Sequence, residues 1–169
     1  DGMEHFFNTV KNAPFYVRTG CDACYILENG EMRYRGVPAA VSEKFKDRMI
    51  FAEGDFSPSP GVFLIPHKTP GLGARGKADG MYIMKNGSLM PDDYVHEQSL
   101  VFDTERGLVI FNSCSHGGAD NIINEVGETF PGKNLLALVG GFHLFARTDD
   151  EVRALAKRIR NTGIAAVYT

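Results

Sequence analysis

The chain has 169 residues, of which 43% are hydrophobic and 23% charged, and this composition excludes an intrinsically disordered protein and predicts one globular domain over residues 1–169. Its 18 Lys and Arg against 21 Asp and Glu leave a net charge of -3, which argues against nucleic acid or an anionic membrane as a partner. No apolar stretch approaches the ~20 residues of a membrane helix, and three cysteines make no disulfide framework, so we expect a cytoplasmic protein.

Short elements are predicted for the first third of the chain. The spacing of Met3, Phe6, Phe7 and Val10 is helical, and Asp1 is available as the N-cap. Apolar runs predict strands at 15–18, 24–27 and 49–52, with one or two helical turns at 41–49 and an Asn29-Gly30 turn after the second strand.

Between residues 55 and 80 the composition changes, because four of the eight prolines and five glycines lie there. We predict a long surface loop, acting as a lid or an insertion, with one strand at 61–66. Within it, Gly71 to Gly76 spells the dinucleotide fingerprint G-x-G-x-x-G, but no strand leads directly into it, so we interpret it as a mobile loop. If this loop closes over a site, Arg75 and Lys77 are candidates to bind a phosphate group of the substrate.

From residue 81 onward, the sequence pattern predicts a β-hairpin followed by alternating helices and strands. Strands are expected at 81–84, 99–103, 108–112, 135–139 and 164–168. Helices are expected from residue 118 and from residue 149, the second with Thr148 and Glu151 as a capping box. This arrangement predicts an α/β fold with substantial antiparallel content.

Two histidines stand where predicted strands end. His116 lies in the run Asn112-Ser113-Cys114-Ser115-His116-Gly117-Gly118, between a strand and a helix, and His143 lies in Gly140-Gly141-Phe142-His143-Leu144 after a buried strand. Carboxyl ends of strands in α/β folds carry ligand sites, and neutral imidazole is a good ligand for first-row metals. We therefore expect the two histidines to share one rim of the sheet.

These motifs, with Asn121-Ile122-Ile123 and the stretch from Asp92 to Val101, resemble the metallo-β-lactamase fold superfamily. More narrowly, they resemble its branch of 7,8-dihydropterin-6-ylmethyl-aminobenzene ribofuranosyl phosphate synthases and related metal-dependent hydrolases. The resemblance implies a four-layer αββα sandwich that binds a divalent metal, as one or two zinc ions or as manganese or iron. It also implies a hydrolase or transferase that acts on a small, phosphorylated or pterin-like molecule through a metal-activated water or oxygen nucleophile.

By the same resemblance, His116 matches a metal ligand, and His143 either binds metal or acts in catalysis by orienting substrate or water. The family's His-x-His-x-Asp-His motif would precede Asp1, and a Gly-His-Cys-Thr-Gly turn would follow Thr169. We therefore expect a sandwich incomplete at both ends, which by itself binds metal poorly and is inactive.

Two other functions remain open: a degenerate domain without metal, and a thiol enzyme that uses Cys114 with a histidine base. For Cys114 the structural interpretation is a small buried thiol, and for the C-x-x-C spacing of Cys21 and Cys24 it is chance. We interpret two further histidines and one acidic cluster as solvated: His67, His96, Asp92, Asp93 and Glu97. Glu97 is also a candidate to reach the edge of the sheet where the metal would bind.

Overall fold

The structure, a computed structural model, describes residues 2–169, so the predicted N-cap Asp1 lies outside it. By their internal contacts the described residues form two compact units, one of residues 2–53 and 73–96 and one of Gly54–Leu72 and Glu97–Thr169. That residues 1–169 make one domain stays a prediction. None of the helices in residues 2–169 is both long and apolar enough to cross a bilayer.

Helices and strands are mixed along the chain, which confirms the predicted α/β class. In chain order the elements are α1 (Gly2–Thr9), β1 (Phe15–Val17), β2 (Cys24–Glu28), β3 (Glu31–Tyr34), α2 (Ala39–Phe45), the 3-10 helix η1 (Lys46–Arg48), β4 (Met49–Phe51), β5 (Phe56–Ser59), β6 (Val62–Pro66), α3 (Leu72–Ala78), β7 (Met81–Lys85), β8 (Ser88–Pro91), β9 (Gln98–Thr104), β10 (Gly107–Asn112), α4 (Ala119–Thr129), β11 (Leu135–Gly140), α5 (Asp149–Asn161) and β12 (Ala166–Tyr168).

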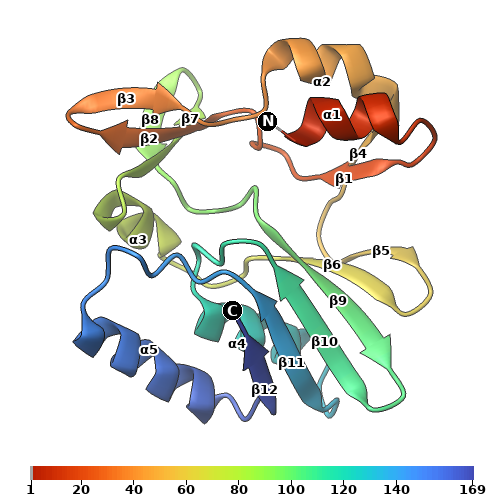
Figure 1. Ribbon diagram of the computed structural model, residues 1–169, viewed down its shortest axis with the longest axis vertical. Helices are drawn as coiled ribbons and strands as arrows, with labels where there is room; N and C mark the ends of the chain where they lie inside the picture. Colours follow the sequence, from red (N-terminus) through yellow and green to blue (C-terminus); the bar gives the residue numbers. More distant parts are fainter. Residues whose placement is uncertain (1) are drawn as a thin grey trace. The chain divides into compact units, whose positions relative to one another are not determined.

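The unit of Gly54–Leu72 and Glu97–Thr169 is built on a mixed sheet with the strand order β12-β11-β10-β9-β6-β5 (Figure 1). β10, β11 and β12 pair in parallel, and β9 and β6 add antiparallel partners beside them. The predicted hairpin is β9–β10, and each parallel pair is connected through a helix, α4 or α5. The carboxyl ends of β10 and β11 therefore lie side by side.

One face of this sheet packs against α4 and α5. Side chains alternate along a strand, so every second residue of these strands points to the opposite face of the sheet. On that face the rings of Phe102 and Phe111 meet edge to face, with centroids 5.7 Å apart. The helix-covered core contains Val101, Leu108, Ile110, Ile122, Ile123, Val126, Leu138, Leu155 and Ile159.

Helix α5 begins at the capping box expected from the sequence. The Glu151 N–H donates to the Thr148 hydroxyl at 3.3 Å, and the Glu151 carboxylate accepts the Thr148 N–H at 2.8 Å. Two of the backbone donors at this helix end are thereby satisfied, which confirms the predicted start of the helix.

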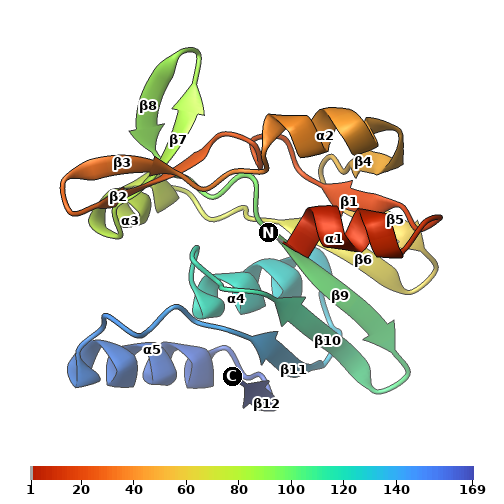
Figure 2. The ribbon, with the colours of Figure 1, turned by 45° about the horizontal axis from the view of Figure 1, so that its top comes forward.

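The other unit contains an antiparallel sheet of the order β3-β2-β7-β8 and a parallel pair, β1–β4 (Figure 2). Its two hairpins turn at Asn29-Gly30 and Asn86-Gly87, and all four of these residues have the positive φ that a type I′ turn requires. Helices α1 and α2 lie side by side, and the Phe7 ring stacks on the Phe45 ring at 4.6 Å.

Segment 55–80 differs from the predicted long loop, because it contains β5, β6 and α3. Pro58 is tolerated in β5 since that strand lies at the sheet edge, where a missing N–H breaks no ladder. Gly76 belongs to α3, which replaces the mobile loop expected at the G-x-G-x-x-G run, and a Cβ there would collide with the Asp92 backbone. A lid or insertion role for the segment stays a prediction.

Leu138 tests the packing of the core between the sheet and its helices. Its side chain is 0% exposed, so we expect Leu138→Ala to lower the free energy of unfolding by about 2–5 kcal/mol in urea denaturation. The matched control Leu89→Ala removes the same atoms from a side chain that is 39% exposed and should cost less than ~1 kcal/mol. Equal costs for the two variants would contradict this description of the core.

Candidate metal centre

His116 lies in the turn that leads from β10 into α4. Asn112, the last residue of β10, holds this turn: its Oδ1 accepts the Ser115 N–H at 2.9 Å, and its Nδ2 donates to Ser99 Oγ at 3.0 Å. Ser115 has a φ of +51°, a backbone conformation that residues other than glycine rarely adopt. The turn is therefore specified by a buried side chain and held in one strained conformation.

His143 is brought to the same rim by the close approach of β11 to β10. Gly140 pairs with Asn112, and a side chain at Gly140 would collide with the Asn112 carbonyl oxygen. The ring centroids of His116 and His143 are 4.6 Å apart, with the rings inclined at 62°. This confirms the prediction that the two strand-end histidines share one rim.

Glu97, which directly precedes β9, joins His116 to a third histidine. One of its carboxylate oxygens accepts a hydrogen bond from His116 Nδ1, and the other lies 3.2 Å from His67 Nε2. His67 follows β6. Its ring fits beside the turn because Gly117 has no side chain, and a Cβ at that position would collide with the ring. The side chains of Glu97 and His67 are 13% and 4% exposed, so these contacts are largely shielded from water.

Glu125 of α4 contacts the opposite nitrogen of His67 and also orders the loop after β6. His67 Nδ1 lies 3.0 Å from Glu125 Oε2. Glu125 Oε1 accepts the N–H groups of Lys68 and Thr69, each at 2.9 Å, and the Thr69 hydroxyl at 2.6 Å. The buried carboxylate is therefore well supplied with donors, as a buried charge must be.

The network sets the charges of its members. Burial by itself would lower the pKa of His67, but hydrogen bonds to Glu125 and Glu97 outweigh burial and raise the pKa to about 9. Burial would raise the pKa of Glu97, yet hydrogen bonds from His116 and His67 lower it to about 2, and the pKa of Glu125 is lowered by a similar balance. At neutral pH, His67 is therefore an imidazolium that donates to two carboxylates.

Several residues differ from their sequence interpretation. His67 and Glu97 are not solvated, because each fills a buried position in the network just described. Asp92 is also buried, at 2% exposed, whereas Asp93 forms an ion pair with Lys85 at the surface. Cys114 is exposed rather than a buried thiol, because it lies in the turn beyond the end of β10.

The donor set at the rim suits a first-row divalent metal. Metal-binding histidines usually donate their second ring nitrogen to a carboxylate, which fixes the tautomer and aims the first nitrogen at the ion. His116 has this arrangement, because its Nδ1 donates to Glu97. The imidazole of His143 is a second nitrogen donor, and the centroids of the two rings are 4.6 Å apart. The donor types at this rim therefore suit a divalent metal, although the two histidines alone are fewer than the three protein ligands of a catalytic zinc site.

A curated protein and a solved structure are similar to this chain. No protein-family model matches the chain. It is 24% identical over 137 residues to the 7,8-dihydropterin-6-methyl-4-(beta-D-ribofuranosyl)-aminobenzene-5'-phosphate synthase of Methanocaldococcus jannaschii, a match covering 75% of this chain and 44% of the relative.

A solved structure, Tm1679, described as a metal-dependent hydrolase of the β-lactamase superfamily, is similar with a TM-score of 0.72 and 28% identity. The similarity covers 90% of this chain and 57% of that chain. The chain thus spans about half the length of the relatives it matches.

The charge of His67 predicts a dependence of stability on pH. Its pKa is about 9 in the folded protein against an ordinary 6.5, so its contribution is fully present below pH 6.5 and is lost as the pH rises through 9. We expect the free energy of unfolding to fall over this window by up to ~1.4 kcal/mol per pH unit. Glu125→Gln should flatten the fall and cost about 3 kcal/mol at pH 7.

Urea denaturation between pH 6 and pH 10 measures both effects. The control is Glu128→Gln, the same change on an exposed residue of α4, which should keep the wild-type profile. If Glu125→Gln and wild type lose stability in parallel across this range, His67 is not the group responsible.

Proposed function

We propose that this chain, which is similar to a metal-dependent hydrolase of the β-lactamase superfamily, carries part of the active site of a metal-dependent hydrolase or transferase, with His116 as a metal ligand. The observation that supports this proposal most strongly is the Glu97 carboxylate on His116 Nδ1, beside the ring of His143. In metal sites a carboxylate commonly orients a histidine ligand in this way, and strained backbone residues often cluster at functional sites.

The proposed division of labour follows from the positions of the side chains. When bound, a divalent metal, which we propose to be one or two zinc ions or else manganese or iron, would polarise a phosphate or carbonyl group and acidify a bound water. His116 holds the ion, and Glu97 keeps the His116 Nδ1 protonated and its ring oriented. His67, as an imidazolium, donates to Glu97 and keeps that carboxylate ionised.

For His143 we propose a catalytic role in orienting substrate or an incoming water. Its φ of +50° holds the side chain in an unusual position, and its ring contacts the ring of Phe145 at 4.7 Å. Phe145 is 85% exposed and offers an aromatic face next to the proposed centre. A small substrate with a flat ring, such as a pterin, could stack on the aromatic ring, and a phosphate group could accept a hydrogen bond from the imidazole.

His116→Ala tests the proposed ligand directly. In the full-length protein we expect the bound metal per chain, measured by elemental analysis, to fall together with turnover of a chromogenic phosphate diester. His5→Ala, an exposed histidine on α1, is the control and should change neither quantity. A metal content unaffected by His116→Ala would remove this residue from the site, and a wild-type protein without metal would favour the degenerate domain.

Glu97→Gln tests the supporting carboxylate. The amide keeps the size of the side chain but loses the charge that orients His116, so we expect metal affinity to fall by about 10–100-fold. Competition with a chromogenic chelator measures the change, and Glu128→Gln serves again as the exposed control. Wild-type affinity in Glu97→Gln would mean that Glu97 serves only the packing of the strand ends.

A further inference from the structure

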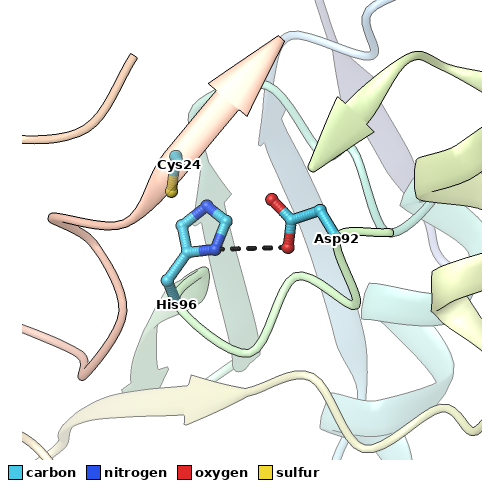
Figure 3. Close-up of side chains that lie close together, drawn as sticks. All are labelled: Cys24, Asp92 and His96. Carbon is cyan, nitrogen blue, oxygen red and sulfur yellow. Dashed lines mark ion pairs between the residues drawn. The ribbon is translucent and has the colours of Figure 1, made fainter. Parts of the chain in front are cut away.

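A second group of metal-binding side chains lies in the unit of residues 2–53 and 73–96. It consists of Cys24 at the start of β2, Asp92 just after β8, and His96 four residues later (Figure 3). One ligand atom from each residue lies within 4.8 Å of the other two, and Figure 3 shows the three side chains pointing toward one another. None of them belongs to the network around His116.

The imidazole of His96 gives the strongest argument for a ligand site at this group. Among residues 2–169, its Nδ1 is buried and has no hydrogen-bond partner. Asp92 Oδ1 lies 3.6 Å from this nitrogen, within ion-pair distance but too far for a hydrogen bond (Figure 3). Two ligands of one tetrahedral zinc ion are about 3.3 Å apart, given zinc–ligand bonds of ~2.0 Å, so this spacing is compatible with a cation held by both side chains.

The other two members have the chemistry that complements this nitrogen. Asp92 is 2% exposed, and its Oδ1 accepts the Tyr94 N–H at 2.8 Å, which orients the carboxylate toward the group. Cys24 Sγ donates to the Gly20 carbonyl at 3.4 Å. Sulfur, nitrogen and oxygen donors are those that zinc takes, and a thiolate with a carboxylate would balance its two positive charges.

The thiol is inert without a cation. Burial, and after it the charge of Asp92, raise the pKa of Cys24 to about 12. The group is therefore protonated at neutral pH, and a protonated thiol is a poor nucleophile. A coordinated ion must displace this proton, so binding would release it and weaken as the pH falls.

The backbone holds the three residues in a fixed arrangement. Cys24 pairs with Ile83 of β7, and the other neighbour of β7 is β8, which leads directly into Asp92. Gly76 of α3 approaches the Asp92 backbone so closely that a Cβ would collide with it. Both ligand-bearing segments are thus positioned by one central strand, so little ordering is needed before an ion binds.

We propose that Cys24, Asp92 and His96 bind a divalent cation of the zinc type, as a metal site whose ligands are entirely separate from His116. Water completes the coordination, because Cys21, the other thiol of the C-x-x-C pair, is not one of the three donors. The ion joins β2 to the segment that follows β8 and so stabilises this unit.

Cobalt(II) distinguishes this site from the centre at His116, because only a thiolate ligand produces intense near-ultraviolet charge-transfer absorption. We expect this absorption when Co²⁺ is added to the full-length protein, its loss in Cys24→Ser, and its retention in His116→Ala. Cys114→Ser is the matched control, since Cys114 is exposed, and it should retain the absorption. Absorption that survives Cys24→Ser, or none in wild type, would overturn the proposal.

A second measurement does not depend on the folding of a Cys24 variant. In His116→Ala protein loaded with one equivalent of Zn²⁺, X-ray absorption should show one sulfur about 2.3 Å from the zinc. His96→Gln should weaken Zn²⁺ binding by more than the ~100-fold that loss of an outer-shell partner costs. A zinc ion without a sulfur neighbour would overturn this site while leaving the function proposed for His116 intact.

Discussion

The buried carboxylate of Glu97 is the constraint around which the metal-binding rim is arranged. A charge that is largely removed from water must be matched by donors, and here the two oxygens are matched by His116 and His67. These histidines come from the turn after β10 and from the end of β6. The Glu97 side chain therefore fixes the relative positions of three strand ends. The His67 ring can approach the turn closely because Gly117 has no side chain.

The electrostatics of the network follow from that same carboxylate. His67 has two carboxylate neighbours, and the favourable interaction with both outweighs the cost of burying its charge. Glu97 in turn remains ionised at neutral pH, so it accepts the proton of His116 Nδ1 rather than donating one. The network thus presents an oriented imidazole at the rim, and imidazole is a common metal ligand in proteins.

Much of the scaffold was predictable because its signals are local. Helical periodicity, the Thr148 and Glu151 capping box and the Asn29-Gly30 turn each act over a few residues, and all are present where expected. β3 was missed because all four of its residues are exposed and leave no hydrophobic alternation. α3 was missed because its glycines, which predict a loop, are needed for close packing.

The site was only partly predictable, because its contacts are long-range. The strand-end rule placed His116 and His143 together, but His67 and Glu125 meet across 58 residues of sequence, and no spacing pattern marks such a pair. The position of Glu97 could have been predicted from the strand register. β9 and β10 form one hairpin in which Leu100 pairs with Phe111, so the residues before β9 must lie beside the turn that holds His116.

The central claim is that His116 binds a metal through Nε2 while Glu97 holds its Nδ1. Anomalous X-ray diffraction from crystals of the zinc-loaded full-length protein, collected on both sides of the zinc edge, tests it most directly. The account predicts a zinc peak about 2.0–2.1 Å from His116 Nε2, with the Glu97 hydrogen bond on Nδ1 intact. A zinc ion bound elsewhere, with His116 making only its contact to Glu97, would contradict it.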